Sequence, residues 1–335
     1  MENSLPALSL LILFVGIDVS KAKLDVACRA GQQLSQRVFA NSAAGYQQLC
    51  DWLASFAAKA VHICLEATGS YSPPVATFLE QAGYAVSVLN PAVLVDYRRS
   101  LNLRRKSDAL DASLLARFAQ ERQPPLWHPL SQAVQVLRHW LRQRRQLLAL
   151  HTQLTNFLED PQLLAPIRQQ WHEQREQIRQ LQVISEVQVV RHLHQQPELL
   201  LLWQRLQTIP GIGWLSAAQL IAAVGSLSRF SHVGALVSFV GLAVSQQQSG
   251  SSVHRRPHLD HHGQRPLRAL FYLAALNAMR SDPALAAWAQ RLRERGKPEA
   301  IVHAAVMRKL VHIVYGVWKT GCDYDPQRAF PLQAA

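Results

Sequence analysis

The first 120 residues alternate short β-branched runs with segments of helical spacing, and this alternation limits the possible folds more than any other feature of the sequence. The pattern predicts strands at 13–20, 23–30, 36–40, 60–67 and 84–90, and helices at 43–58 and 72–83. Three strands, a helix, a strand, a helix and a strand are typical of an α/β domain with a mixed sheet.

The pattern becomes helical at Asp108, where a helix is predicted to run until Pro124 and Pro125 end it. Residues 130–207 also have helical periodicity, and prolines divide them into two or three long helices. Those helices form either a coiled-coil arm, which would be expected to dimerise, or an ordinary helical bundle.

We therefore expect three parts and a tail. The α/β domain spans 10–125, the helical coiled-coil arm 126–205, a mainly α C-terminal domain 206–322 and the tail 323–335. The C-terminal domain starts with a turn between two helices, with glycines at 211 and 213; beyond it only residues 245–263, "SQQQSGSSVHRRPHLDHHG", are not predicted as helix and are expected to form a loop. The end of the chain from residue 326 is expected to be disordered.

The positive charge of the chain is concentrated beyond residue 120. Residues 1–120 hold 11 Lys and Arg against 9 Asp and Glu, whereas residues 121–335 hold 24 against 13. This excess indicates a polyanionic partner, because each phosphate contact releases counterions. A merely soluble basic surface is the alternative, and charge alone does not separate DNA from RNA.

Cysteine spacing and the N-terminal run both favour a cytoplasmic protein. Cys28, Cys50, Cys64 and Cys322 lack the spacing of a zinc site or a disulfide framework, so they are predicted to be buried, reduced thiols. Glu2 stands where a signal peptide needs positive charge, and no stretch reaches the roughly 18 consecutive apolar residues of a membrane span. We therefore expect a cytoplasmic protein without membrane association.

Four acids of the first domain are candidates for a metal site. Asp18 and Glu66 follow apolar strand residues, where a carboxylate is costly unless it is paired or binds a cation. Asp108 and Asp111 are three residues apart and therefore share one face of a helix. Each acid also has an ordinary explanation, as a solvent-facing strand end or as a first-turn acid of a helix capped by Ser107 or Asp108.

Taken together, the four acids match the order found in a ribonuclease H-like fold. One acid lies on the first strand, one on a later strand and two on a following helix, and such folds present carboxylates to Mg²⁺ or Mn²⁺. Two such ions stabilise the attacking and leaving oxygens of phosphoryl transfer. Hard oxygen ligands without nearby His or Cys favour magnesium over zinc.

Seven motifs, in order, relate the chain to a known family. They are "GIDVSKAKLDV", "ICLEATGSYSPPVATFLEQAGYAVSVLNPA", "KSDALDASLLARF", "LQTIPGIG", "FVGL", "SGSSV" and "LRALFYLAALNA". From about residue 14 to 322 the chain closely resembles the Piv-like DEDD transposases of the insertion-sequence one-hundred-ten group. This chain departs from the family in "AVSQQQ", where proline and basic residues are usual, and in "DHHG", where a lysine is usual before the glycine.

The resemblance implies a ribonuclease H-like (RuvC-like) N-terminal domain, a coiled coil and a C-terminal transposase domain. It places the catalytic, metal-binding tetrad on Asp18, Glu66, Asp108 and Asp111, and the serine nucleophile that becomes joined to a DNA strand end on Ser249. It also implies a structured non-coding guide RNA, called a bridge RNA, which pairs with target and donor DNA. A serine is a weak nucleophile that a nearby cation or base must activate.

Two groups of residues are predicted to contact nucleic-acid phosphates. In "IPGIG", Gly211 and Gly213 resemble a helix-hairpin-helix turn whose backbone amides approach phosphate, and a plain glycine turn is the alternative. The basic candidates are Arg104, Arg105, Lys106, Arg255, Arg256, Arg265 and Arg268. For the cluster of His254, His258, His261 and His262, adjacent arginines favour a phosphate-facing segment over a metal site.

The expected function is that of a Mg²⁺-dependent, RNA-guided DNA recombinase that mobilises its own insertion sequence. Its partners would be the element ends, the target DNA, the guide RNA and further copies of itself in a homodimer or homotetramer. One alternative is a RuvC-like nuclease that cuts junction DNA through metal-activated water, without a covalent intermediate. The other is a non-enzymatic nucleic-acid-binding scaffold that uses the basic part alone.

Overall fold

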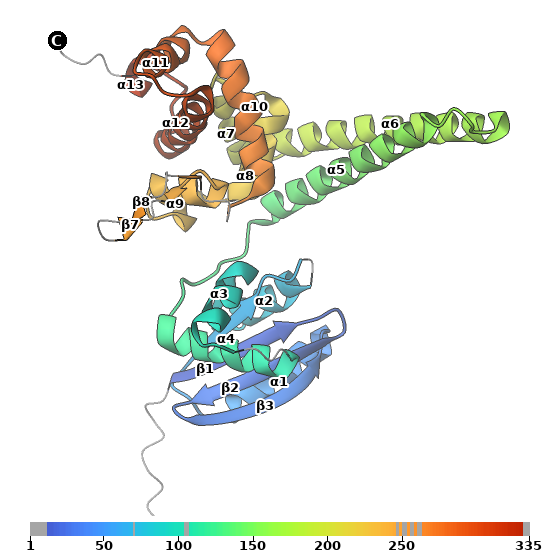
Figure 1. Cartoon of the computed structure of the whole chain (residues 1–335). Helices are drawn as coiled ribbons and strands as arrows, with labels where there is room; N and C mark the ends of the chain where they lie inside the picture. The colour runs from blue at the N-terminus through green and yellow to red at the C-terminus, as the bar shows by residue number, and fades with distance from the viewer. Residues whose placement is uncertain are drawn as a thin grey trace, which may run out of the picture. The chain divides into compact units, whose positions relative to one another are not determined.

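Figure 1 shows the computed structural model of the chain. The structure describes residues 12–69, 71–103, 107–245, 248–249, 253–254, 258–259 and 263–330. Contacts divide the chain into two compact units, residues 1–129 and 130–335. The predictions for Arg104, Arg105, Lys106, Arg255, Arg256, His261, His262 and the extreme ends of the chain lie outside the described residues.

The first unit is built on a five-stranded mixed sheet. Its strands are β1 (Ile12–Val19), β2 (Lys23–Ala30), β3 (Gln33–Ala40), β4 (Ala60–Glu66) and β5 (Ala85–Leu89), in the order β3-β2-β1-β4-β5. The strand β2 pairs antiparallel with both β1 and β3, whereas β4 and β5 run parallel to β1. The predicted α/β domain with a mixed sheet is therefore confirmed.

Two helices cover each face of this sheet, because alternate residues of the strands point to opposite sides. Val15 and Ile17 of β1 pack with Leu49 of α1 (Ala43–Ala54) and Leu79 of α2 (Ser72–Gln81). On the other face, the core contains Phe14, Leu94 of α3 (Pro91–Ser100) and Leu115 of α4 (Asp108–Arg122). The helix α1 ends at Ala54, four residues before its predicted end.

The helix α3 was not among the predicted elements. Its first turn begins with Pro91, and the side chain of Asn90 accepts a hydrogen bond from the backbone N–H of Ala92 at 3.1 Å. An Asn–Pro pair is a regular start signal of a helix, since asparagine caps the N-terminus and proline fits the first turn. The signal was therefore present in the sequence.

The helix α4 lies directly against β1 because the facing residues are small (Figure 1). A Cβ atom at Gly16 would overlap the backbone of Ala112 and Ala116. Ala27, which is opposite Gly16 in the β1–β2 ladder, packs against the same two alanines. This close approach matters for the candidate site, because α4 begins at Asp108.

The second unit is mostly helical and begins with two long helices. They are α5 (Gln132–Leu158) and α6 (Ala165–His194), which form a hairpin that extends away from the shorter helices of the same unit (Figure 1). Pro166 lies in the first turn of α6, and Pro197 starts α7 (Pro197–Gln207), so the predicted proline boundaries are confirmed. Whether the hairpin dimerises stays a prediction.

The remaining elements of the second unit are mostly shorter helices, several of which pack against one core helix. They are α8 (Trp214–Val224), the 3-10 turn η1 (Leu227–Arg229), α9 (Val233–Val240), α10 (Arg265–Ser281), α11 (Pro283–Glu294), α12 (Glu299–Thr320) and α13 (Pro326–Ala329). Among the described residues, α12 is the one helix whose length and composition would allow it to cross a membrane. Val306, Leu310 and Val314 of α12 are fully buried in the core of this unit, as expected of a core helix.

Two expectations about this unit are wrong. The tail is ordered as far as Phe330, because residues 326–329 form α13 and the ring of Phe330 lies against Trp288. The ammonium group of Lys309 lies 4.6 Å from the centre of the Phe330 ring. Cys322 is exposed, whereas all four cysteines were expected to be buried.

Candidate functional site

The register of the sheet brings three acids to one level on the face that α4 covers. Asp18 of β1 is directly opposite Asp25 of β2. Glu66 ends β4 and follows Leu65, which is the partner of Ile17 in the parallel ladder. Because side chains alternate along a strand, these three carboxylates share the face to which Gly16 belongs.

The helix α4 adds the other two predicted acids. The hydroxyl of Ser107 accepts a hydrogen bond from the backbone N–H of Leu110 at 3.4 Å and caps the helix. Asp108 and Asp111 therefore lie in the first turn, where the positive end of the helix dipole favours negative charge. Asp108 is exposed and Asp111 is buried.

Two cations pair with the acids of α4. The Nζ atom of Lys23 lies 2.8 Å from Oδ2 of Asp108 and 2.9 Å from Oδ2 of Asp25. These hydrogen bonds raise the pKa of Lys23 above its usual value. The guanidinium of Arg98, on α3, pairs with the carboxylate of Asp111. The helix that sequence patterns missed therefore contributes a charge to the site.

The pKa of Asp18 is raised by its burial and by the nearby acids. Burial, followed by the negative charges of Asp108, Asp111, Glu66 and Asp25, raises the pKa of Asp18 to about 6. A strongly raised carboxylate pKa with identifiable charged neighbours is a common property of functional sites. The structure therefore brings the four predicted acids together, and Asp25 joins them as a fifth.

Asp25 and Lys23 were not among the predicted residues, although a signal for Asp25 existed. In "KLDVACRA", Asp25 is surrounded by apolar strand residues just as Asp18 is. Pairing these two neighbouring strands as a hairpin would have placed the two acids opposite each other. The contacts of Lys23 and Arg98 depend on how α3 and α4 pack, which no local pattern specifies.

The donor chemistry of this acid site fits a hard divalent cation. All five acids offer carboxylate oxygens, which Mg²⁺ and Mn²⁺ prefer, and a cation would relieve the repulsion that raises the pKa of Asp18. Within the described residues, no three His, Cys, Asp or Glu side chains form a ready-made metal site. Lys23 and Arg98 instead engage the carboxylates of Asp108 and Asp111.

Ser249 lies in the second unit, in a segment that is partly paired rather than a simple loop. The strand β6 (Val244–Ser245) pairs with β9 (His258–Leu259), and β7 (Gln248–Ser249) pairs with β8 (Val253–His254). Both ladders are antiparallel, and Figure 1 labels β7 and β8 close to α9. The backbone of Ser249 is opposite Val253, and its side chain is outside the described part of the chain.

Two glycines in direct backbone contact lie beside the paired strands β6 to β9, which we call the serine hairpin. A Cβ atom at Gly263 would overlap the backbone of Gly241, which has a positive φ of 83°. The backbone N–H of Gln264 donates to the carbonyl of Phe239 at 2.9 Å. A Cβ atom at Gly241 would lie 2.7 Å from Nη1 of Arg268. Arg268, which was predicted to contact phosphate, therefore packs against the contact between Gly241 and Gly263.

The other predicted phosphate ligands have different settings. A Cβ atom at Gly211 would overlap the carbonyl of Ala274, so the close approach that requires glycine is to α10. Gly213 precedes α8, is exposed, and has no atom within 4 Å of an ideal Cβ. Arg265 is exposed in the first turn of α10. Gly213 and Arg265 therefore have the open setting that a phosphate contact needs.

The helix α5 adds a basic surface that was not singled out from the sequence. It contains four arginines and no acid. Arg138 donates to the carbonyls of Ala222 and Ala223 at the end of α8, and the Nε atom of Arg144 lies 2.7 Å from a carboxylate oxygen of Glu186. Arg142 and Arg145 are exposed. Exposed arginines on an acid-free helix suit a polyanionic partner.

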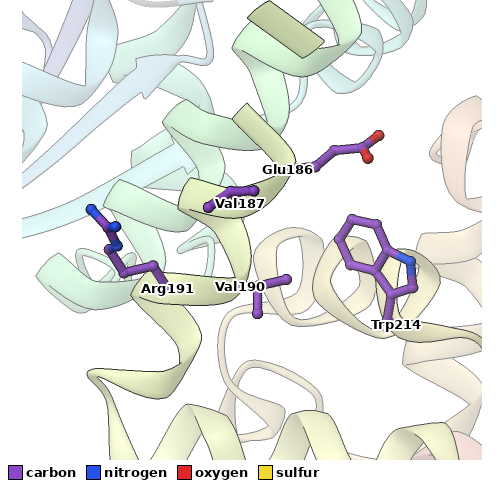
Figure 2. A pocket seen from close by; sticks show the side chains of 5 residues that line it. All are labelled: Glu186, Val187, Val190, Arg191 and Trp214. Atoms are coloured by element: carbon purple, nitrogen blue, oxygen red, sulfur yellow. The ribbon is translucent and has the colours of Figure 1, made fainter. Parts of the chain in front are cut away.

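A shallow hollow of about 380 Å³ lies between α6 and the start of α8 (Figure 2). Its lining residues are Glu186, Val187, Val190, Arg191 and Trp214. The lining is almost entirely apolar, and the acid at its rim is already paired with Arg144. None of the predicted catalytic residues belongs to it, and we assign no reaction to this hollow.

Comparison with known proteins identifies the class of protein as a DNA transposase. Residues 15–164 match a family described as a transposase, and residues 203–290 match the transposase IS116/IS110/IS902 family. The pilin gene-inverting proteins of Moraxella bovis and Moraxella lacunata are each 31% identical over 326 residues, which is 93% of this chain and 97% of the relative. The transposase for insertion sequence element IS1111A of Coxiella burnetii is 42% identical over 48 residues, 14% of this chain and 13% of that protein.

The chain therefore belongs to the IS116/IS110/IS902 family of insertion-sequence transposases, enzymes that recombine DNA. The resemblance drawn from its motifs is confirmed. The first family match contains the acid site, and the second contains the serine hairpin. Membership in an enzyme family argues against the alternative of a non-enzymatic scaffold.

Proposed function

We propose that this transposase is a metal-dependent, RNA-guided recombinase that cleaves and rejoins DNA through a serine–DNA intermediate. Asp18, Glu66, Asp108 and Asp111 would hold Mg²⁺ or Mn²⁺, and Ser249 would be the nucleophile. The observation that carries the proposal is that the four predicted acids, from β1, β4 and α4, lie close together. The charges of the other three contribute to the raised pKa of Asp18. The match of the serine hairpin to the family supports the second half of the proposal.

The topology of the first unit supports a ribonuclease H-like, RuvC-like assignment. Three antiparallel strands followed by two parallel ones, in the order β3-β2-β1-β4-β5, are the arrangement expected of that fold. The acids lie on the first strand, on β4 and on α4, as the resemblance implies. The α5–α6 hairpin would then be the coiled-coil part, and the helices from α7 onward the transposase domain.

The roles of the chain's own residues follow from this assignment. A bound divalent ion would supply charge stabilisation for phosphoryl transfer. The Oγ atom of Ser249 would form a bond to phosphorus as its proton passes to a base, and the bond from phosphorus to the departing sugar oxygen would break. A free hydroxyl of another strand would then attack the phosphoserine, release the serine and reseal the DNA. The covalent step keeps the energy of the phosphodiester, so no ATP is needed.

The basic surface of the second unit would bind the nucleic acids. Exposed Arg142 and Arg145 of α5, Arg265 of α10 and the backbone at Gly213 are placed for phosphate contacts. Such contacts position a duplex without reading its sequence, which suits an enzyme whose target choice comes from base pairing with a guide RNA. The assembly would be a homodimer or homotetramer acting in the cytoplasm.

The decisive experiment is to trap the covalent intermediate. Full-length protein is incubated with Mg²⁺, guide RNA and end-labelled donor DNA, and the label that stays with denatured protein is measured. We expect Ser249→Ala to abolish the adduct, whereas Ser251→Ala and Ser252→Ala, which change neighbouring serines, retain it. Nicked DNA with no adduct in the wild type, and full cleavage by Ser249→Ala, would instead support the metal-dependent nuclease.

The guide RNA is tested separately. We expect the purified complex to contain an RNA encoded beside the gene, complementary to both the element ends and the insertion site. Removal of this RNA by ribonuclease should abolish recombination, and a guide with an altered target segment should redirect it. Recombination that survives ribonuclease treatment would remove the RNA-guided part of the proposal.

A second candidate function is inversion of a DNA segment rather than movement of an element. It is favoured by the relatives that this chain matches over almost their whole length, which are named pilin gene-inverting proteins. A plasmid with two recombination sites in inverted orientation distinguishes the two outcomes. Inverted product without excised circles supports this candidate, and circular element DNA supports transposition.

A further inference from the structure

Lys23 joins two acids that belong to different elements of the acid site. Its ammonium group lies 2.9 Å from the carboxylate of Asp25 on β2 and 2.8 Å from the carboxylate of Asp108 on α4. Both distances are those of charge-assisted hydrogen bonds. The side chain of Asp25 is 10% exposed, whereas that of Asp108 is 57% exposed. Lys23 therefore connects a nearly buried strand acid to an open helix acid.

Asp25 has no place in the predicted tetrad, yet the sheet places it beside one of the four acids. It is directly opposite Asp18, and its charge contributes to the raised pKa of Asp18. A nearly buried carboxylate beside another one is costly unless a cation compensates it. Lys23 is that cation, and it reaches Asp25 from the beginning of the same strand.

The same ammonium group contacts an oxygen that the proposed metal site needs. Asp108 offers Oδ2 to Lys23, and a divalent ion that took this carboxylate as a ligand would share the side chain with the ammonium group. Two cations on one carboxylate repel each other, so the ion and Lys23 compete for Asp108. The carboxylate of Asp25 offers the lysine a second partner.

We propose that Lys23 is a built-in competitor of the catalytic metal ion. Its ammonium holds Asp108 against the sheet, a divalent ion displaces it from Asp108, and Asp25 then keeps the displaced lysine beside the site. Lys23 thereby weakens metal binding and makes the release of Asp108 part of the binding event. This inference rests on the proposed function, because it takes Asp108 to be a metal ligand.

The test measures Mn²⁺ binding to the full-length protein by titration calorimetry and electron paramagnetic resonance, without DNA or RNA. Lys23→Met keeps the length and the apolar stem but removes the charge, and Lys23→Gln also keeps a hydrogen-bond donor. We expect both variants to bind Mn²⁺ about three- to tenfold more tightly than wild type, since a competing charge is removed from a partly screened site. Lys21→Met is the matched control, because Lys21 is exposed in the same turn and forms no ion pair with any described residue.

Thermal unfolding supplies a second readout, which does not require a binding titration. With a chelator present, we expect Lys23→Met to melt at a lower temperature than Lys21→Met, because Asp25 and Asp108 lose their shared counter-charge. Saturating Mn²⁺ should raise the melting temperature of Lys23→Met by more than it raises that of the control.

The outcomes separate this inference from the function on which it rests. Unchanged or weaker Mn²⁺ binding by both Lys23 variants would overturn the competitor role, since Lys23 would then be only a structural counter-charge. Mn²⁺ binding that is also unchanged in Asp18→Asn would overturn the proposed metal site itself. Tighter binding in the Lys23 variants together with weaker binding in Asp18→Asn supports both.

Discussion

The acid site and the serine hairpin are built in contrasting ways. The acids lie on a five-stranded sheet whose ladders contain five to eight residue pairs each, and α4 packs on that sheet with direct backbone contact at Gly16. Ser249 lies in a strand of two residues, in a ladder of two pairs. A second two-pair ladder, between β6 and β9, and the backbone contact between Gly241 and Gly263 also hold the serine hairpin.

This contrast indicates how the two halves of the proposed chemistry would be organised. Side chains on a sheet and a closely packed helix are held in position before any ligand arrives, which metal ligands require. A nucleophile on a short hairpin depends on few backbone hydrogen bonds of its own. We therefore expect bound nucleic acid or a second copy of the chain to complete the positioning of Ser249, and the predictions below test this difference.

The largest effect is expected from Asp18→Asn, which removes the acid at the centre of the site. Cleavage should fall by more than about 100-fold, since even residues that only orient metal ligands contribute ~10–100-fold. The variant should nevertheless be more stable than wild type at neutral pH. Gel assays of DNA cleavage and thermal unfolding measure the two effects, and Asp96→Asn, a change at an exposed acid of the same unit, is the control.

The stability gain of Asp18→Asn should depend on pH in a defined direction. The pKa of Asp18 is about 6 in the folded chain and near 3.8 when unfolded, so the folded state binds this proton more tightly. The ionised carboxylate therefore destabilises the fold progressively as the pH rises from 4 to 6, and fully above that. The gain should be complete above pH 6, shrink on acidification and vanish below about pH 4. A gain that does not change with pH would contradict this account.

The next effect compares the two regions through their close-packed glycines. The added methyl group of Gly16→Ala would overlap the backbone of α4, and that of Gly263→Ala would overlap the backbone of Gly241. Each should destabilise its own unit, toward the upper end of the ~1–3 kcal/mol typical of overpacking. Hydrogen exchange locates the damage: Gly16→Ala should expose amides of β1 and α4, and Gly263→Ala those of α9 and α10. Gly213→Ala, with open space around it, should change neither region.

The same two variants are also compared by their Mn²⁺ binding. Gly16→Ala should weaken it, because α4 carries two of the proposed ligands, whereas Gly263→Ala should leave it unchanged and reduce only adduct formation. Equal losses of Mn²⁺ binding in both variants would mean that the two regions are not organised separately.

The smallest effect is expected from Ser107→Ala, which removes the cap of α4. Loss of an N-cap costs about 1 kcal/mol, and here it should loosen the turn that carries Asp108 and Asp111. Ser42→Ala removes the equivalent cap of α1, whose hydroxyl accepts from the N–H of Gly45 at 3.3 Å. We expect similar losses of stability in the two variants but reduced cleavage only in Ser107→Ala. Reduced cleavage in both would point to a general effect of stability.

Local patterns were enough to predict most of the elements that position the acid site. Short β-branched runs predicted the five strands, and the change to a helical pattern at Asp108 predicted the start of α4. The prediction failed for α3, although Asn90 and Pro91 form a regular helix start, and for the tail, where Phe330 packs on Trp288. The strands β6 to β9 were not predicted either, because strands of two residues are too short to produce a periodic pattern.

The sequence by itself determined the mixed sheet, the helical remainder, the identity of the four acids and the family, because each of these depends on spacing along the chain. Tertiary structure alone decided that Asp25 joins the acids, that Lys23 bridges Asp25 and Asp108, and that Gly211 serves packing against α10. These features arise from contacts between elements that are far apart in the sequence. Strand register and the close fit of α4 at Gly16 fix such contacts, and neither is encoded in any single segment.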